Sequence, residues 1–278
     1  MNASPTPSLL ALLSDFGLQD PYLAQLKGVV CTYCPQVQIV DICHELPPFA
    51  LRTAAFFLSA SAAYFPPRTV FLAIVDPGVG SARDVLILER GGQQFVAPNN
   101  GLLGLLLKGK PDAPARLWRL PAPALPQGSL VFAGRDIMAP AVGRLLAGAA
   151  PSDLGEPMPL NELSVWNWAC PEVKDREIRA EILHVDRFGN LILNISDEFR
   201  PFASVGLRLR YLDLEYPLFL ADFYAQLPPR ALGLIPGSQG YLEIALNCAS
   251  AADFLGLAGR GAGQLPAPDS RLQLSILW

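Results

Sequence analysis

The chain has 278 residues, of which 51% are hydrophobic and 17% are charged, and its formal net charge is −4. This length permits two domains with separate cores, and the composition is that of a globular protein. The net negative charge gives no basic surface for nucleic acid or an anionic membrane. No apolar run reaches the roughly 18–20 residues of a membrane-spanning helix.

The N-terminal residues and the cysteines indicate a cytoplasmic protein. Residues 1–7 contain no basic segment, so they do not resemble a signal peptide. The five cysteines are an odd number without a disulfide framework. Cys31 and Cys34 form a CxxC, but no second pair accompanies it, which argues against a zinc or thioredoxin-like site. We therefore expect free thiols in a reducing compartment and no bound metal.

The first part of the chain alternates strands with helices. The apolar runs predict strands at 9–13, 37–42 and 69–75. Asp20 is expected to cap a helix that starts at Pro21, and further helices are expected at 50–64, 101–107 and 137–146. A hairpin is expected around Gly91-Gly92. This alternation predicts an α/β domain over residues 8–160.

The pattern changes in the last hundred residues, where short strands and turn residues replace the helices. The expected strands are 180–185, 191–195, 207–214, 231–235, 240–245 and 272–277. Such a series is typical of a small antiparallel barrel or sandwich. We therefore expect a linker at 161–175 and an all-β domain at 176–278.

Three strands of the first domain end in polar features. Asp15 follows the first strand, a loop at 43–49 follows the second, and Asp76 follows the third. If the strands are parallel neighbours, these features face one crevice, where open α/β sheets bind their ligands. Carboxylates there can hold the hydroxyls of a ribose. Neither GxGxxG nor a Walker A motif is present, which favours a nucleoside over a nucleotide.

Other sequence features limit the reactions and ligands that can be expected. The sequence has two histidines, His44 and His184, and both fit structural roles as well as catalytic ones. No GxSxG is present, so a hydrolase with a nucleophile elbow is not expected. In the second domain, residues 186–190 are either an ordinary hairpin turn or a base-binding loop. In the latter, Phe188 would stack on a ring and Asn190 would hydrogen-bond its edge, a pairing suited to adenine.

Several segments together resemble the S-adenosylmethionine (SAM) hydroxide adenosyltransferases, or SAM hydrolases, which are relatives of the bacterial fluorinase and chlorinase. The similar segments follow in order over nearly the whole chain, and they are 14–22 with 27–29, 40–49, 75–81, 98–103, 132–136, 185–190 and 240–245. Any one of these motifs is weak, but seven in register are specific.

The resemblance implies an N-terminal Rossmann-like α/β domain, a C-terminal antiparallel β-barrel and a homotrimer. The ligand would lie between the first domain of one subunit and the barrel of the next. By resemblance, Asp15 would hold the ribose hydroxyls, and Phe49 and Phe132 would line the site. Asp20 and Ser238 would hold the methionine end. The adenine would be bound by Phe188, Asn190, Asn247 and Cys248.

The family reaction is attack of water or hydroxide on the ribose 5′ carbon of SAM, which gives adenosine and L-methionine without a further cofactor. Asp76 and Arg83 match two members of a water-activating Asp-Arg-His set. Ala133 stands where the family has the histidine, and a missing base typically slows a reaction by ~10²–10⁴-fold. We therefore expect a slow SAM hydrolase, with a non-catalytic SAM- or adenosine-binding protein as the alternative. A halogenase is less favoured, because the Asp76 carboxylate would repel a halide ion.

Overall fold

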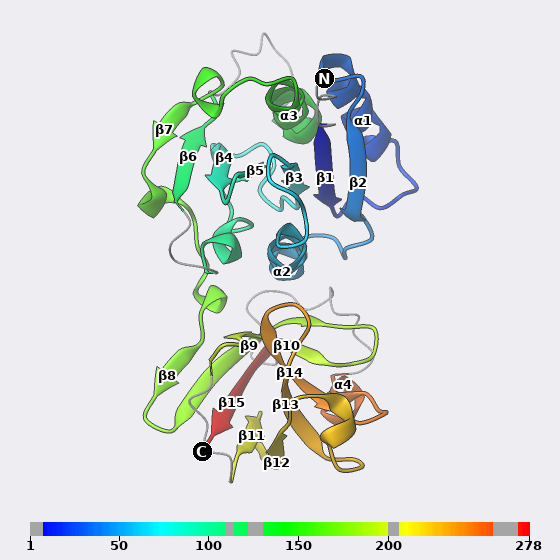
Figure 1. The fold of residues 1–278 in the computed structure, drawn as a ribbon, viewed down its shortest axis with the longest axis vertical. Coiled ribbons are helices and arrows are strands. Elements are labelled where there is room, and N and C mark those ends of the chain that lie inside the picture. Colours follow the sequence, from blue (N-terminus) through cyan, green and yellow to red (C-terminus); the bar gives the residue numbers. More distant parts are fainter. Residues whose placement is uncertain (1–7, 109–113, 122–129, 200–205, 258–271) are drawn as a thin grey trace, which may run out of the picture. The chain divides into compact units, whose positions relative to one another are not determined.

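The computed structural model describes residues 8–108, 114–121, 130–199, 206–257 and 272–278. The chain divides into two compact units, Met1–Val165 and Trp166–Trp278, and each is described by itself (Figure 1). The expected α/β unit followed by an all-β unit is confirmed. Within the described ranges, we find no helix of the length and hydropathy needed to cross a membrane.

A seven-stranded sheet in the order β2-β1-β3-β5-β4-β6-β7 forms the centre of the first unit. The strands are β1 (Leu9–Ser14), β2 (Gln38–Cys43), β3 (Val70–Ile74), β4 (Val85–Arg90), β5 (Gln93–Pro98), β6 (Ala115–Arg119) and β7 (Glu156–Met158). Strands β2, β1, β3 and β5 are parallel, whereas β4, β6 and β7 join antiparallel. The expected hairpin at Gly91-Gly92 is the β5–β4 pair.

Helices cover both faces of this sheet (Figure 1). Helices α1 (Tyr22–Tyr33) and α3 (Ala139–Leu146) pack on the face that contains Leu72 and Ile74, and α2 (Leu51–Ala62) packs on the face that contains Phe71 and Ala73. The alternation along β3 thus serves two cores, which explains its uninterrupted apolar sequence. The short 3₁₀ helices of this unit are Gly104–Leu107, Leu130–Phe132, Pro151–Asp153 and Leu160–Glu162.

Two helix starts differ from the prediction. Helix α1 is capped by Pro21 in a helical conformation without a side-chain hydrogen bond, so Asp20 is not its N-cap. The helix expected at 137–146 begins earlier, with a π-helical turn over Gly134–Met138 that leads directly into α3. Pro140 has no N–H to donate to the preceding turn, which disfavours regular α-helical bonding there.

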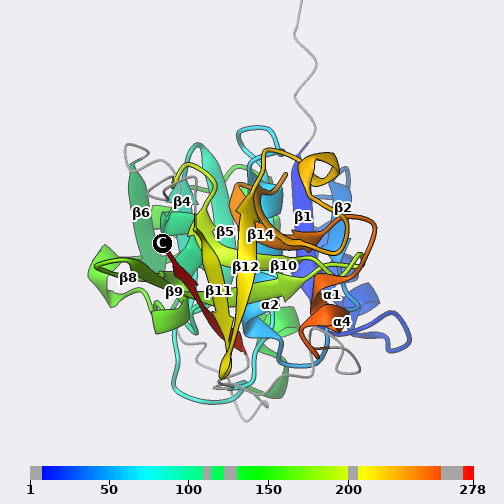
Figure 2. The same ribbon diagram turned by 90° about the horizontal axis from the view of Figure 1, so that it is seen from below.

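The second unit is a closed β-barrel with one additional strand. The strands are β8 (Glu172–Lys174), β9 (Glu177–Val185), β10 (Leu191–Ser196), β11 (Arg208–Tyr211), β12 (Leu214–Leu220), β13 (Leu232–Pro236), β14 (Tyr241–Leu246) and β15 (Gln273–Leu277). Their order is β10-β14-β13-β12-β11-β15-β9-β8, and pairing of β10 with β9 closes the ring of seven. Among the described strands, β8 alone lies outside the ring, so closure leaves the other seven without open edges. Figure 2 shows β15, β11 and β12 side by side.

The expected barrel is confirmed, with two differences in detail. The pair β12–β13 is parallel, because the segment between them, which contains the 3₁₀ helix Tyr224–Gln226, returns the chain to the same end. The single strand expected at 207–214 is a hairpin of β11 and β12, turning at Leu212 with φ of 53°. The remaining short helices of this unit are Asn167–Ala169 and α4 (Ala251–Phe254).

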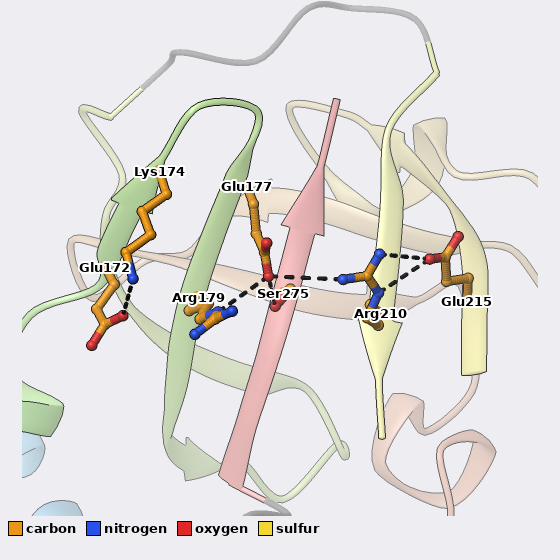
Figure 3. Close-up of polar contacts among 7 residues, drawn as sticks. All are labelled: Glu172, Lys174, Glu177, Arg179, Arg210, Glu215 and Ser275. Carbon is orange, nitrogen blue, oxygen red and sulfur yellow. Dashed lines mark hydrogen bonds and ion pairs between the residues drawn. The ribbon is translucent and has the colours of Figure 1, made fainter. Parts of the chain in front are cut away.

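A row of charged side chains crosses the outer face of the barrel (Figure 3). Glu177 on β9 accepts from Ser275 on β15 at 2.7 Å and lies 3.3 Å from Arg179 and 3.9 Å from Arg210 on β11. Arg210 also pairs with Glu215 on β12 at 2.9 Å. The bond from Ser275, followed by the arginines, lowers the pKa of Glu177. Cross-strand pairs of this kind each stabilise a sheet by roughly 0.2–1 kcal/mol, so we assign the row a role in the stability of the barrel.

Candidate functional site

The parallel strands place their polar ends at one edge of the sheet, as expected. Ser14 at the end of β1 is in register with Ile74 of β3, so Asp15 and Asp76 follow neighbouring strands at the same edge. Cys43 at the end of β2 pairs with Leu13 on the other side of β1. The side chain of Asn100, after β5, donates to the carbonyl of Val75 at 2.8 Å. This edge is the crevice in which open α/β sheets bind ligands.

The turn after β3 holds a buried ion pair between Asp76 and Arg83. The two side chains are 7% and 13% exposed. Arg83 also donates to the carbonyl of Gly78 and, at 3.3 Å, to the hydroxyl of Ser81. The Gly78 N–H donates to Asp76 at 3.3 Å, and Gly80 takes a φ of 84° that only glycine adopts easily. The turn thus wraps around the guanidinium and fixes the carboxylate.

Burial lowers the pKa of Arg83, because desolvation disfavours its charged form. The guanidinium nevertheless stays charged at any physiological pH. A fixed cation beside a buried carboxylate favours the ionised form of that carboxylate. Asp76 is therefore suited to accept a hydrogen bond from a water molecule.

A cavity of about 370 Å³ lies beside Arg83. Its lining includes Ala133 and Ile137 from the segment before α3, and Arg119 from β6. A water molecule occupies about 30 Å³ in the liquid, so the cavity is large enough for several waters or for an imidazole ring. Ala133 therefore borders open space that Arg83 also lines.

Close packing at Gly134 sets the place of Ala133. A Cβ atom on Gly134 would lie 2.9 Å from Cδ1 of Ile74, which is two residues before Asp76. Glycine therefore lets the π-helical turn approach the end of β3 closely. Such π turns are frequent at functional sites because they redirect side chains. The geometry brings Ala133 to the same strand end as the Asp76–Arg83 pair.

Asp15 is hydrogen-bonded to the loop that contains Phe49. Its Oδ2 atom accepts from the Phe49 N–H at 2.8 Å. Phe49 has a φ of 67°, a conformation that costs energy for a bulky residue, and its ring is 65% exposed. Burial raises the pKa of Asp15, and the hydrogen bonds from backbone N–H groups oppose this effect. The structure thus brings together Asp15, predicted to hold the ribose, and Phe49, predicted to pack over the ligand.

Phe132 belongs to an aromatic cluster next to this carboxylate. Its ring lies 5.7 Å from that of Phe16 and 5.3 Å from that of Tyr22, both in edge-on arrangements. The guanidinium of Arg135 lies 5.1 Å from the Phe132 ring centre. The cluster links the residue after Asp15 to the residue before Ala133.

Two predicted contacts to the methionine end are exposed in this structure. Asp20 is an exposed residue in the turn before α1. Ser238 is exposed in the turn between β13 and β14 of the second unit, where it accepts from Gln239 at 3.4 Å. The two residues belong to different units, so each is described within its own unit.

The loop between β9 and β10 is held together by Asp186. Its carboxylate accepts from the N–H groups of Phe188 at 2.8 Å and Asn190 at 2.9 Å, and from the Asn190 side chain at 2.9 Å. The carbonyl of Gly189 accepts from Ala252 in α4 at 2.9 Å. This bonding leaves the Phe188 ring 76% exposed. Asn190 is only 4% exposed, and its amide nitrogen is already used inside the loop.

Sequence reasoning missed a polar pair behind this loop, in which Glu243 is buried and Tyr224 is exposed. The hydroxyl of Tyr224 donates to Glu243 on β14 and lies 3.4 Å from the Asn190 amide nitrogen. Burial, and then the charge of Asp186, raise the pKa of Glu243; burial and the bond to Glu243 raise that of Tyr224. The signal in the sequence is a single glutamate within the otherwise apolar strand 241–246.

The other predicted adenine contacts lie at the end of β14. Cys248 is exposed, and its φ of 53° marks a tight turn. The side chain of Asn247 donates to the carbonyl of Leu227 at 3.1 Å, which fixes that turn. Leu246 and Ala249 form a bridge across it. Backbone groups of such a turn can approach a flat ligand closely.

Neither histidine occupies the space beside Ala133. His184 lies within β9 of the barrel, and burial lowers its pKa to about 4, so it is neutral at physiological pH. His44 follows β2 and contacts Ser14 and Asp41. It is not among the residues that line the cavity.

Two family models match the chain. The N-terminal domain of SAM hydroxide adenosyltransferase matches residues 10–155, and the C-terminal domain matches residues 180–261. A protein from Thermus thermophilus named (R)-S-adenosyl-L-methionine hydrolase is 38% identical over 253 residues, covering 88% of this chain and 94% of its own. A protein of the same name from Salinispora tropica is 34% identical, covering 91% and 95%. A fluorinase from Nocardia brasiliensis is 29% identical, covering 88% and 92%.

Solved structures share the fold over the whole chain. A conserved uncharacterised protein from Thermotoga maritima superposes with a TM-score of 0.79 at 28% identity, covering 97% of this chain and 100% of its own. A conserved hypothetical protein from Thermus thermophilus gives a TM-score of 0.73 at 32% identity, covering 98% and 100%. The sequence motifs, both family models and the paired α/β and barrel units agree. The chain belongs to the SAM hydroxide adenosyltransferase family.

Proposed function

We propose that this protein hydrolyses SAM to adenosine and L-methionine. The observation that carries the proposal is the buried Asp76–Arg83 pair at the carboxyl end of β3, on the strand next to that of Asp15. Membership of a family with several members named SAM hydrolases supports it. The site uses no further cofactor, since SAM itself is the substrate.

In the proposed reaction, the oxygen of a water molecule attacks the ribose 5′ carbon while the bond from that carbon to sulfur breaks. The sulfur takes the electron pair and leaves as the neutral thioether of methionine. The water's proton passes to solvent, with Asp76 accepting the hydrogen bond that aligns the water. Arg83 holds Asp76 ionised and in place. Because Ala133 carries no base, we expect the rate to be low.

The family resemblance supports the following binding roles. Asp15 would accept from the ribose hydroxyls, with Phe49 and Phe132 packing around the sugar. Asp20 and Ser238 would hold the polar end of methionine. The barrel residues Phe188, Asn190, Asn247 and Cys248 would bind the adenine, Phe188 by stacking its exposed ring on the base.

We also propose that the protein acts as a homotrimer, in which the first unit of one chain and the barrel of another bind the same ligand. The family resemblance supports this arrangement. The molar mass in solution, measured by light scattering, tests it: a mass of one chain would contradict the proposal.

The test of the function is direct. Purified protein is incubated with SAM, and adenosine and methionine are separated by chromatography and quantified against a protein-free control. Equal amounts of both products, rising with protein concentration, are expected. A second function, non-catalytic binding of SAM or adenosine, is favoured by Ala133 alone. Tight binding by calorimetry without any product would establish that second function instead.

The pKa of Asp15 gives a first prediction. Because burial raises this pKa, adenosine binding should weaken as the pH falls through that raised value, where the carboxylate loses its charge. A raised folded-state pKa also means that the ionised form destabilises the fold at neutral pH. Asp15→Asn should therefore bind adenosine more weakly, without this acid limb, and unfold at a higher temperature. Calorimetry and thermal unfolding measure both effects.

Asp20→Asn is the control for this prediction, since it changes an exposed carboxylate placed at the methionine end. It should leave both adenosine binding and the unfolding temperature unchanged. Unchanged adenosine binding in Asp15→Asn would contradict the assigned role of Asp15.

The exposed ring of Phe188 gives a second prediction. Stacking of an aromatic side chain on a base contributes about 1–3 kcal/mol, so Phe188→Ala should weaken adenosine binding by roughly fivefold to 150-fold. The unfolding temperature should stay the same, because the ring is 76% exposed. Phe219→Ala removes another exposed ring, on β12, and should leave binding unchanged. Equal affinities for the wild type and Phe188→Ala would rule out the stacking role.

A further inference from the structure

Four polar side chains form a continuous network next to the Asp15 turn. They are Lys27, Asp41, His44 and Ser14. Nζ of Lys27 on α1 lies 2.7 Å from Asp41 on β2, and the other Asp41 oxygen lies 3.2 Å from Nε2 of His44. Nδ1 of His44 lies 2.7 Å from the hydroxyl of Ser14 at the end of β1. Ser14 is 0% exposed and His44 is 4% exposed, so these two side chains of the network are sealed from solvent.

Asp41 connects Lys27 to His44 in this network. Asp41 can only accept when ionised, so Lys27 is the donor in their 2.7 Å bond, whereas Nε2 of His44 lies 3.2 Å from Asp41 without a hydrogen bond. Burial alone would raise the pKa of Asp41, but its interactions with Lys27 and His44 outweigh burial and lower it. Nδ1 of His44 and the Ser14 hydroxyl share a hydrogen bond, and the Ser14 oxygen accepts from the N–H of Phe16 at 3.5 Å. These contacts connect Lys27 to the Asp15 turn through Asp41, His44 and Ser14.

His44 holds the Asp15 turn from both sides. Its side chain bonds Ser14 on one side of Asp15, and its carbonyl accepts from the Gly17 N–H at 2.8 Å on the other. Asp15 itself accepts from Phe49, which belongs to the same loop as His44. The turn and the loop are thus joined at three successive points, with Asp15 in the middle.

The same residue types occur in serine hydrolases, but Ser14 cannot act as a nucleophile here. A nucleophilic hydroxyl must reach the substrate, whereas Ser14 is fully buried and its oxygen is already bonded to His44. The arrangement is therefore suited to fixing a neighbouring group. That neighbour in the chain is Asp15.

We infer that His44 is a positioning residue, which holds the carboxylate of Asp15 in the orientation that binds the ribose hydroxyls. The inference rests on the proposed function for its ligand. Small displacements of a binding group weaken its interactions strongly. Removal of the imidazole should therefore raise KM for SAM about tenfold while kcat changes less than about threefold, because the Asp76–Arg83 pair is untouched.

The experiment compares three variants of the full-length protein. His44→Ala removes the imidazole. His44→Asn keeps a short acceptor near Ser14 and should recover part of the lost affinity. Thr69→Ala is the matched control, because it also removes a buried hydrogen bond, from Thr69 to the Pro66 carbonyl at 2.7 Å, but at the opposite end of β3. The control should leave KM unchanged.

Amide hydrogen exchange of the ligand-free protein gives a readout that does not depend on SAM. The N–H groups of Phe16 and Gly17 should exchange at least about tenfold faster in His44→Ala and at the wild-type rate in Thr69→Ala. Unchanged exchange and unchanged KM in His44→Ala would overturn the inference, as would an equal rise of KM in Thr69→Ala. If the wild type binds neither SAM nor adenosine, the proposed function fails, while the exchange rates still decide whether His44 holds the turn.

Discussion

Ala133→His is expected to raise the rate of adenosine formation by about 10²–10⁴-fold, the usual contribution of a positioned base. The cavity of about 370 Å³ that Ala133 shares with Arg83 gives the imidazole space without displacing the core. Close contact of Gly134 with Ile74 keeps position 133 at the strand end that carries Asp76. The new histidine would complete the Asp-Arg-His set.

The rate of this variant should also acquire a new pH dependence. A histidine base acts only when neutral, so the rate should rise with pH through the ordinary imidazole pKa of about 6.5. Ala133→Leu is the control, because it fills part of the same space without a ring nitrogen and should give no increase. Adenosine quantified by chromatography over a pH series measures both effects.

The outcomes separate the two candidate functions. A slow wild type that is accelerated in Ala133→His, but not in Ala133→Leu, supports a hydrolase limited by the missing base. A wild type with no rate, restored only by histidine, contradicts an active enzyme and indicates a binding protein that retains the rest of the site. Tight SAM binding with no rate in any variant also favours the binding protein.

The α/β unit could be predicted because its signals are local. Each parallel strand is apolar throughout, since both faces are covered, and each ends in a polar turn such as that of Asp15 or Asp76. The common edge then follows from parallel pairing. The start of α1 was predicted wrongly, because Asp20 fits the composition of an N-cap, whereas Pro21 takes that position in the structure.

The missed features of the site depend on contacts between distant residues. His44 lies 30 positions from Ser14, and Tyr224 lies 19 positions from Glu243, so no spacing rule for a single helix or strand connects them. The β11–β12 turn was missed because Leu212 is apolar in a position with positive φ, where glycine or asparagine is usual. In these cases tertiary packing determines the local structure, so local sequence patterns do not predict it.

Asp76→Asn is expected to lower the rate of adenosine formation by about 10²–10⁴-fold. Asp76 is the proposed acceptor for the attacking water, and an amide is a much weaker acceptor than a carboxylate. Adenosine is neutral and makes no proposed contact with Asp76, so its affinity should change less than about threefold.

The same substitution should also lower the free energy of unfolding, because it breaks the buried ion pair with Arg83. It leaves the guanidinium of Arg83, which is 13% exposed, without its counter-charge, and an unpaired buried charge costs on the order of 3 kcal/mol. Glu162→Gln is the control, because it breaks an exposed ion pair with Arg119. The side chain of Glu162 is 48% exposed and that of Arg119 is 42% exposed. Exposed pairs of this kind contribute about 0–1 kcal/mol to stability. Denaturant unfolding and single-turnover assays therefore give paired predictions: Asp76→Asn loses both stability and rate, and Glu162→Gln loses neither. A full rate in Asp76→Asn would remove Asp76 from the reaction, whatever its effect on the fold.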